Sequence, residues 1–403
     1  MTALLQRLRN SEALLVLCGS TFLVMVGQGI VSPVLPLYAK DFGVGAEMVG
    51  LTLTVFALAR LILNIPAGML ADRFGRRVLL IGGPIITAVG MFGSGFADSI
   101  WTLLFWRFIA GGGSAFYMSG AMIYLIDIAP PEKRARYVAT NQWALSVGVA
   151  VGPGIGGLVA DTYSLSTPFH VVGVTAIATA IYAAVRLPET RGQADTGEVD
   201  PDQPPVSAWT FLTTKRFLLV AAVTATIFMT RAGTRGTLTP LHATEALDWG
   251  PSEIGLVFMV TGFMTLFTLM PAAWASDRLG RSSVILFSGV MAAAGTAVVA
   301  SSTSAGGFVV GNIIMTLGTG TAGPAPAAYV ADIAPPNLRG MAVALYRSAG
   351  DVGFLAAPPL LGFIGESTSL PTAMYVAAVL VAVTAVMFSI GSRGDSAAGR
   401  QVS

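Results

Sequence analysis

The stretch YLIDIAPPEKRARYVA (Tyr124–Ala139) returns as YVADIAPPNLRGMAVA (Tyr329–Ala344), 205 residues later. The same spacing links two further blocks of sequence. LADRFGRR at 70–77 corresponds to ASDRLGRS, and GVAVGPGIGG at 148–157 corresponds to GFLAAPPLLG. Three separate blocks at one offset indicate that the chain consists of two copies of one structural unit.

The composition indicates that these two units lie in a membrane. Apolar residues make up 54% of the 403 positions and charged residues only 11%, whereas a soluble domain has roughly 25% charged residues. A soluble protein of this length could not hide so much apolar surface from water. The net charge of +2 argues against a nucleic-acid partner. One cysteine, Cys18, and two histidines exclude a disulfide scaffold and a histidine metal cluster.

A membrane-spanning helix needs about 20 apolar residues, and the chain contains twelve such runs. We therefore expect an all-α membrane protein with two pseudo-symmetric six-helix bundles. In the first half the spans are expected at about 13–39, 47–70, 78–97, 101–128, 136–161 and 166–187. In the second half they are expected at about 217–243, 252–275, 283–301, 305–331, 340–364 and 370–391.

The predicted bundles cover residues 1–187 and 217–403, with a cytoplasmic linker at 188–216. The linker includes QADTGEVDPDQPP, which has nothing to bury. Six spans in each half make corresponding helices run in the same direction. Parallel halves of this kind place a substrate site between them, near the bilayer midplane.

The positive charges predict the orientation of the spans. Of the 23 Lys and Arg residues, five lie in the interior of predicted spans and Lys40 follows the first span. The remaining 17 lie in the terminal segments, in the links that join even-numbered spans to the next odd-numbered span, or at the span ends next to those links. The positive-inside rule therefore places both termini in the cytoplasm. We expect a monomeric multi-pass protein of a bacterial plasma (inner) membrane.

The repeated blocks resemble the motifs of the major facilitator superfamily over nearly the whole chain. Gly68–Arg77 resembles the signature loop that follows the second helix in that superfamily, and a degenerate copy follows the eighth predicted span. Arg107–Gly113 resembles the buried-arginine motif of the fourth helix. The resemblance implies a secondary transporter that works by alternating access, without enzyme activity.

The signature loop implies a conformational latch that holds the outward-facing state. A tight turn between two helices needs a residue such as Gly75 that can adopt a positive φ. The alternative interpretation is a positively charged anchor with a tight turn. The residues assigned to the latch are Gly68, Asp72, Arg73, Gly75, Arg76, Asp127, Asp277 and Arg278.

The fifth predicted span carries a pattern that resembles the antiporter motif of drug:proton exporters. Glycines allow close helix approach and proline disrupts the helical hydrogen bonds. Ordinary helix packing is the alternative interpretation and is compatible with the same function. The motif residues are Gly148, Gly152, Pro153, Gly156 and Gly157.

Ionisable residues inside the spans are costly and mark a transport pathway by default. Arg231 with Arg235, and Arg347 with Asp351, lie one helical turn apart, so each pair shares a helix face. Asp351 is either a proton site or the neutralising partner of Arg347. The full set of pathway candidates is Gln28, Arg60, Asn64, Arg107, Asn141, Gln142, Arg231, Arg235, Tyr346, Arg347 and Asp351.

The leading hypothesis is a proton-coupled multidrug-type exporter of small amphiphilic molecules, with no cofactor besides the coupling proton. The first predicted span lacks the acid found in many drug:proton exporters, so Asp351, Asp127 or Asp72 must bind the proton. Sodium coupling and facilitated diffusion stay open. The excess of arginines favours an alternative, a carrier or exchanger for carboxylate- or phosphate-bearing substrates. A receptor would need a folded soluble domain, and an enzyme would need a catalytic cluster; the sequence predicts neither.

Overall fold

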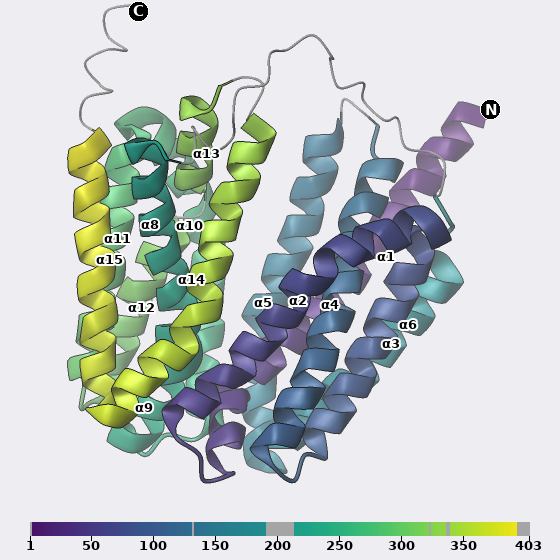
Figure 1. Cartoon of the computed structure of the whole chain (residues 1–403). Helices are drawn as coiled ribbons and strands as arrows, with labels where there is room; N and C mark the ends of the chain where they lie inside the picture. Colours follow the sequence, from purple (N-terminus) through teal and green to yellow (C-terminus); the bar gives the residue numbers. More distant parts are fainter. Residues whose placement is uncertain (1, 131–132, 191–212, 322–323, 336–338, 393–403) are drawn as a thin grey trace, which may run out of the picture. The chain divides into compact units, whose positions relative to one another are not determined.

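The structure is a computed structural model of the 403-residue chain and describes residues 2–130, 133–190, 213–321, 324–335 and 339–392. Every regular element within these ranges is a helix (Figure 1). Twelve helical segments of the described chain are long and apolar enough to cross a membrane. The predicted all-α architecture with twelve spans is therefore confirmed.

The first half contains six helices, and the second half contains six spans, two of which are composite. The helices of the first half are α1 (Thr2–Lys40), α2 (Ala46–Phe74), α3 (Arg76–Gly95), α4 (Ile100–Ile128), α5 (Arg134–Thr162) and α6 (Thr167–Arg186). Those of the second half are α8 (Lys215–Met229), the π-helix η2 (Thr230–Leu238), α9 (Thr239–Leu247), α10 (Pro251–Leu279), α11 (Arg281–Ser301), α12 (Ala305–Thr321), α13 (Pro324–Ile333), α14 (Arg339–Ser367) and α15 (Leu370–Ser392). One span comprises α8, η2 and α9, and another comprises α12 and α13.

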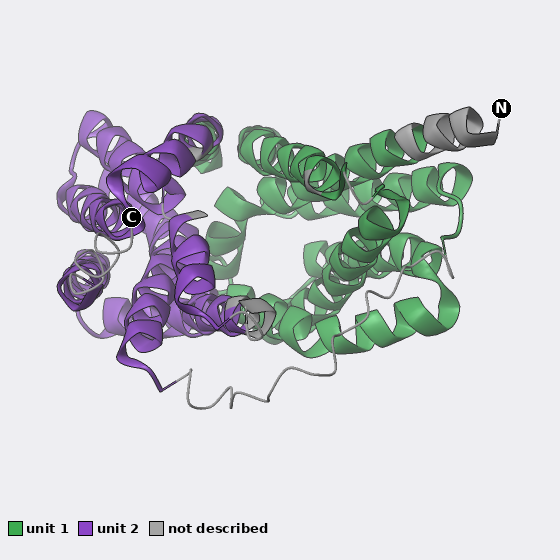
Figure 2. Cartoon of the chain, turned by 90° about the horizontal axis from the view of Figure 1, so that it is seen from above, with its two compact units in different colours: residues 1–44, 51–198, 250–262 green, residues 45–50, 199–249, 263–403 purple. Residues whose placement is uncertain are grey.

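The chain divides into two compact units, which are coloured separately in Figure 2. Unit 1 contains residues 1–44, 51–198 and 250–262, and unit 2 contains 45–50, 199–249 and 263–403. The first turns of α2 thus belong to unit 2, and the first turns of α10 belong to unit 1. The predicted limits of the two halves stay a prediction, and most of the predicted linker lies outside the described residues.

The helices pack in the same order in both units. In unit 1, α1 packs against α5, and α3 packs against α4 and α6. In unit 2, α8 packs against α14, and α11 packs against α12 and α15. Equivalent positions of the two copies also form the cores, and the buried pairs include Leu80 with Ile285, Tyr124 with Tyr329, and Leu125 with Val330. The sequence repeat is therefore also a repeat of helix packing within each unit.

Two helices extend further than the apolar runs predicted. We expected the second span to end near residue 70 and the eighth near 275, but α2 continues to Phe74 and α10 to Leu279. Hydropathy reports only the part of a helix that lies in lipid, whereas the helix itself continues until its backbone turns. Gly75 and Gly280, with φ of 96° and 87°, end the two helices.

Local capping also fixes where some spans begin. The Ser99 side-chain oxygen accepts a hydrogen bond from the backbone N–H of Thr102 at the start of α4. The Thr214 hydroxyl accepts one from the Phe217 N–H at the start of α8. Such caps satisfy backbone donors that have no partner within the helix. They place both helix starts within two residues of the positions expected from hydropathy.

The seventh span departs from a uniform α-helix. Its middle section, η2, is a nine-residue π-helix with the sequence TRAGTRGTL. π-helical segments are rare and occur frequently at functional sites. The apolar pattern of the sequence did not predict this change, because hydropathy is insensitive to the hydrogen-bond register of a helix.

Candidate functional site

The turn between α2 and α3 consists of Gly75 alone. Its backbone angles, φ 96° and ψ 160°, lie in a region that is essentially restricted to glycine. Gly280 adopts similar angles, φ 87° and ψ 144°, between α10 and α11. The predicted positive φ at Gly75 is therefore confirmed, and both copies of the repeat make the same turn.

Arg76, the first residue of α3, anchors this turn to α4. Its Nε donates a hydrogen bond to Oδ2 of Asp127 at 2.9 Å, and its Nη1 donates to the Ala71 carbonyl at 3.2 Å. Its Nη2 also lies 3.4 Å from Oδ1 of Asp72. The side chains of Arg76 and Asp127 are only 8% and 2% exposed, whereas that of Asp72 is 76% exposed. Asp127 is therefore the main counter-charge of Arg76.

Two residues that follow α6 complete this cluster, and sequence reasoning missed both. Glu189 accepts hydrogen bonds from the backbone N–H groups of Arg76, at 2.9 Å, and Arg77, at 3.2 Å. The Thr190 hydroxyl donates to Oδ2 of Asp127 at 2.9 Å. A carboxylate is favourable at a helix N-terminus because it accepts from unpaired donors there and opposes the positive end of the helix dipole. Both residues fall within the predicted linker at 188–216. The sequence signal that points to them is an acid followed by a threonine, directly after a span.

The second copy of the cluster uses different residues from those predicted. Arg281 Nε donates to Oδ2 of Asp332 at 2.9 Å, with the side chains 28% and 56% exposed. These positions correspond to Arg76 and Asp127. The predicted residue Arg278 instead lies over the ring of Trp274, with 4.7 Å between the guanidinium carbon and the ring centroid.

The other predicted latch residues lie around the cluster rather than in it. Asp277 and Arg73 are exposed, and the guanidinium of Arg73 lies 5.2 Å from the ring centroid of the adjacent Phe74. Gly68 is half-buried, and a Cβ placed on it would meet no heavy atom within 4 Å. In this structure the contacts thus concentrate on Gly75, Arg76 and Asp127.

The backbone of Gly75 yields a testable prediction about stability. We expect Gly75→Ala to lower the free energy of unfolding by about 1–3 kcal/mol, because its angles are strained for alanine. A Cβ would also lie 2.3 Å from Oε2 of Glu189. Gly280→Ala is the matched control, because it has similar angles and nothing within 4 Å of the added atom. Denaturation of both purified variants should show the larger loss for Gly75→Ala; equal losses would contradict a contribution from Glu189.

Three glycines of the predicted antiporter motif form one face of α5. Because they are spaced four residues apart, they share a side of the helix, and this side lies against the backbone of α1. A Cβ added at Gly148, Gly152 or Gly156 would lie 2.7, 2.5 or 2.0 Å from the carbonyl oxygens of Phe22, Val26 and Ile30, respectively. The motif therefore holds α1 and α5 in backbone contact.

The remaining motif residues contact the start of α10, also within unit 1. A Cβ at Gly157 would lie 2.2 Å from the Pro251 carbonyl oxygen, and one at Gly255 would lie 2.4 Å from that of Pro153. The repeat-related contacts occur in unit 2. There a Cβ at Gly362 would lie 2.4 Å from the Ala46 carbonyl oxygen, and one at Gly50 would lie 2.4 Å from that of Pro358. Each unit therefore has a glycine–proline contact of the same design.

A carboxylate forms a hydrogen bond beside each of these two glycine–proline contacts. Oδ2 of Asp161, near the end of α5, accepts a hydrogen bond at 3.0 Å from the Ser252 N–H in the first turn of α10. Oε2 of Glu366, near the end of α14, accepts one at 3.0 Å from the Ala46 N–H at the start of α2. Asp161 and Glu366 are 205 residues apart, so they are repeat equivalents. The sequence placed them only near helix ends.

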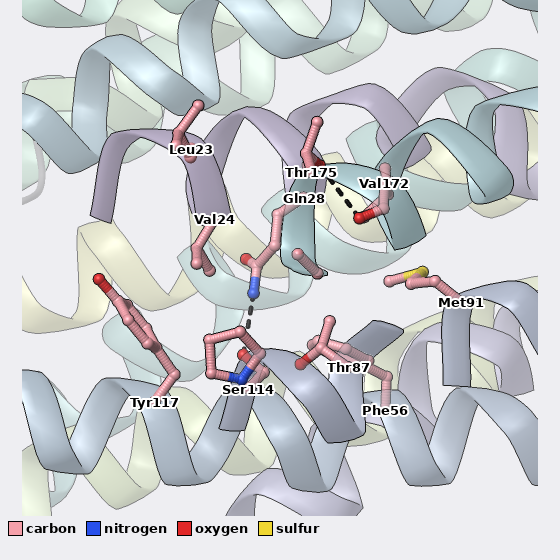
Figure 3. Close-up of a pocket in the computed structure, with 13 residues that line it drawn as sticks. Leu23, Val24, Gln28, Phe56, Thr87, Met91, Ser114, Tyr117, Val172 and Thr175 are labelled. Carbon is pink, nitrogen blue, oxygen red and sulfur yellow. Dashed lines mark hydrogen bonds between the residues drawn. The ribbon is translucent and has the colours of Figure 1, made fainter. Parts of the chain in front are cut away.

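Gln28 lines a small cavity inside unit 1, shown in Figure 3. Its Nε2 donates to Oγ of Ser114 at 3.0 Å, and nearby the Tyr117 hydroxyl is 3.0 Å from that of Thr21. The cavity measures about 20 Å³, which is enough for one water molecule. It is too small for an amphiphilic substrate in this structure.

Arg107 is buried in unit 1 among neutral groups. It is 4% exposed, its Nε lies 3.5 Å from the Thr52 carbonyl oxygen, and its guanidinium lies 4.5 Å from the ring centroid of Phe56. The repeat-equivalent Asn312 is fully buried and donates to the Phe308 carbonyl oxygen at 3.0 Å. This structure places Arg107 within a packed bundle and not at an open surface.

The remaining predicted pathway residues of unit 1 are more accessible. Arg60 and Asn141 are half-buried, and Asn64 and Gln142 are exposed.

In unit 2, the guanidinium of Arg231 donates to the Thr319 carbonyl of α12. Tyr346 of α14 is 7% exposed. Arg347 and Asp351 are both exposed.

Twelve spans, repeated helix packing and matched turns define a multi-pass membrane transporter. The sequence profile of the Major Facilitator Superfamily matches residues 17–238 and 221–398. The chain therefore belongs to this superfamily, as the sequence motifs predicted. Its members are transporters and not enzymes, which confirms the predicted absence of enzyme activity.

Similar proteins support the same assignment. An uncharacterized MFS-type transporter, MJ1560, of Methanocaldococcus jannaschii is 23% identical over 91% of this chain and 95% of its own length. The quinolone resistance protein NorA of Staphylococcus aureus is 27% identical over 64% of this chain and 66% of its own length. The crystal structure of a bacterial homologue of the human lysosomal transporter Spinster has a TM-score of 0.80, with 16% identity over 96% of this chain and 97% of that one.

Proposed function

We propose that this transporter exports small amphiphilic molecules by proton-coupled alternating access. The similarity to NorA, a quinolone resistance protein, supports export of drug-like compounds. The observation that carries the proposal is the glycine face of α5, where Gly148, Gly152 and Gly156 allow backbone contact with α1. That pattern resembles the antiporter motif, and the described contacts give its glycines a defined packing role.

The proposal includes an orientation in the bacterial plasma membrane. The distribution of Lys and Arg supports cytoplasmic termini. In that orientation the turn at Gly75 faces the cytoplasm, and the carboxylates of Asp161 and Glu366 lie at the outer ends of the helices. The cluster of Arg76 with Asp127 is then suited to act as a cytoplasmic latch, because its buried ion pair exists only while α3 and α4 keep this arrangement.

Asp351 is the proposed proton site. It lies within α14, inside a predicted span, and its side chain is exposed. Asp127, by contrast, is 2% exposed and accepts bonds from both Arg76 and Thr190. A proton on Asp127 would compete with a charge-assisted hydrogen bond, which is among the stronger hydrogen bonds in proteins. Asp127 is therefore assigned to the cluster with Arg76, and Asp351 is the acid proposed for coupling.

The proposal predicts that an imposed pH gradient drives transport. Everted membrane vesicles that contain the protein should accumulate ethidium when the lumen is made acidic, because protons leave as the dye enters. Collapsing the gradient with nigericin should return accumulation to the level of vesicles without the protein. Dye uptake that is independent of the gradient, across several amphiphilic dyes, would contradict proton coupling.

A second candidate function, a carrier or exchanger for anionic substrates, is favoured by a different observation. Unit 2 contains Arg231, Arg235 and Arg347 inside its spans but only Asp351 as an acid in a span interior among its described residues. The two candidate functions, export of amphiphiles and transport of anions, are compatible if the exported amphiphiles carry an anionic group.

A further inference from the structure

A surface groove of about 420 Å³ lies in unit 1, where the N-terminal third of α1, the start of α3 and the end of α6 meet. Two arginines, Arg77 and Arg186, and one acid, Glu12, line it together with apolar residues that include Val185 and Leu187. None of these side chains belongs to the predicted pathway or to the predicted latch. The groove therefore needs an explanation of its own.

Arg77, the second residue of α3, reaches across the groove to α6. Its Nη2 donates a hydrogen bond to the carbonyl oxygen of Ala184, in the last turn of α6. Its Nε is buried and makes no hydrogen bond among the described residues. Since a guanidinium has five N–H donors, the protein leaves part of the hydrogen-bonding capacity of Arg77 unused.

Arg186, the last residue of α6, supplies the second positive charge. Its Nη1 lies 3.1 Å from Oε1 of Glu12, and the two side chains are 57% and 61% exposed. An exposed ion pair of this kind contributes little to stability, so Glu12 does not prevent Arg186 from binding another anion. The nearby carboxylate of Glu189 accepts from the backbone N–H of Arg77. Two arginines against one glutamate give the lining a net charge of +1.

The surface next to the groove, on its membrane side, is apolar. Leu15 of α1, Val78 of α3 and Val185 of α6 are 69%, 53% and 75% exposed. All three lie inside predicted spans, where exposed apolar side chains face lipid. Basic pockets between membrane helices on the cytoplasmic side bind phospholipid headgroups. The groove combines such a basic pocket with a surface for acyl chains.

The repeat provides a comparison, because unit 2 has a groove at the equivalent place. It includes Ser282 and Ser392, which correspond to Arg77 and Leu187, and the residues that line it are uncharged. The hydroxyls of these two serines hydrogen-bond to each other. Gly391 stands at the position of Arg186. The fold therefore forms this region without the two arginines, which favours a binding role for them in unit 1.

We propose that Arg77 and Arg186 bind the phosphate group of an anionic phospholipid in the cytoplasmic leaflet. The choice of leaflet rests on the proposed orientation, whereas the binding chemistry is independent of the substrate and of the direction of transport. Charge-assisted hydrogen bonds from the two guanidinium groups hold the phosphate. The acyl chains lie along the exposed side chains of Leu15, Val78 and Val185. The bound lipid thereby links the start of α3 to the end of α6.

Native mass spectrometry of the purified full-length protein tests this proposal. Phosphatidylglycerol and phosphatidylcholine with the same acyl chains both contain a phosphate, but only the first has a net negative charge. We expect the wild type to retain phosphatidylglycerol about tenfold more strongly, because each arginine near a membrane surface favours anionic lipid. Equal retention of the two lipids by the wild type would overturn the proposal.

Variants of the lining locate the site. Arg77→Gln and Arg186→Gln should each lower the preference about fivefold. Arg186 is exposed, so its variant tests the site even if Arg77→Gln, which also loses the bond to Ala184, does not fold. Glu12→Gln should strengthen retention of phosphatidylglycerol, because it removes the acid from the lining; a purely structural role of the arginines predicts no such gain.

Arg73→Gln is the matched control. Arg73 is an exposed cation one helical turn before Arg77, and it lies outside the lining of the groove. This variant should retain the lipid preference of the wild type. An unchanged preference in Arg186→Gln, or an equal loss in Arg73→Gln, would contradict binding in the groove.

A soluble phosphate ester is the other source of the same chemistry. sn-Glycerol 3-phosphate carries the phosphate without acyl chains, so the protein should retain it at least about tenfold more weakly than phosphatidylglycerol, as the loss of apolar contact implies. Equal retention would assign the groove to soluble phosphate esters and overturn the lipid assignment. Loss of gradient-driven ethidium transport with the lipid preference intact would reject the proposed function alone.

Discussion

Asp127→Asn is expected to lower the free energy of unfolding by about 3–5 kcal/mol, because it leaves a buried guanidinium without its counter-charge. The Arg76 and Asp127 side chains are 8% and 2% exposed and 2.9 Å apart. The same substitution also weakens the hydrogen bond from Thr190. We expect gradient-driven dye transport to fall with it, because the turn between α2 and α3 loses its tie to α4.

The repeat supplies the control for this prediction. Asp332→Asn removes the equivalent carboxylate from Arg281 at the same distance of 2.9 Å, but the side chains are 28% and 56% exposed. Exposed ion pairs contribute about 0–1 kcal/mol to stability. The free energy of unfolding of this variant should therefore be close to that of the wild type. Denaturant titration of the two purified variants measures the difference. Equal losses would show that burial does not distinguish the two copies of the cluster.

Gly156→Ala is expected to abolish transport. The added Cβ would lie 2.0 Å from the carbonyl oxygen of Ile30, so α1 and α5 would have to separate. Small residues allow membrane helices to approach closely, and backbone atoms of a packed helix cannot move aside as a flexible side chain can. The measurement is ethidium accumulation in everted vesicles, normalised to the amount of protein in the membrane.

Gly82→Ala is the control for a glycine inside a span. A Cβ at Gly82 of α3 would meet no heavy atom within 4 Å, and alanine favours a helix over glycine by about 1 kcal/mol. This variant should therefore transport as well as the wild type and be at least as stable. Full activity in Gly156→Ala would contradict the assigned role of the glycine face in α5.

The fold could be predicted from the sequence because lipid imposes simple rules. Apolar runs predicted all twelve spans, and the 205-residue offset between Tyr124 and Tyr329 predicted the repeat of structural units. Gly75 was identified because a tight turn between two helices requires a residue without a side chain. These inferences depend on local composition or on a pattern that occurs twice.

The features that the sequence did not predict depend on contacts between distant segments of the chain. Glu189 accepts a hydrogen bond from the backbone N–H of Arg76, which lies 113 residues away in the sequence. No local sequence pattern reveals that a carboxylate will cap such a remote helix. The predicted latch includes Arg278 and not Arg281, because the prediction followed the Asp-Arg pair in the sequence, whereas it is Arg281 that donates to Asp332 in the structure. The π-helix was missed because helix register depends on packing rather than on hydropathy.

The central claim, that substrate and proton move in opposite directions through this chain, can be measured directly. Proteoliposomes that contain the purified protein and the pH indicator pyranine receive ethidium from outside, without an imposed gradient. Dye entry should drive protons out and raise the pyranine-reported pH of the lumen. The response should be absent in Asp351→Asn, even though that variant still exchanges dye for dye. Dye entry into wild-type vesicles with no change in lumenal pH would contradict the account.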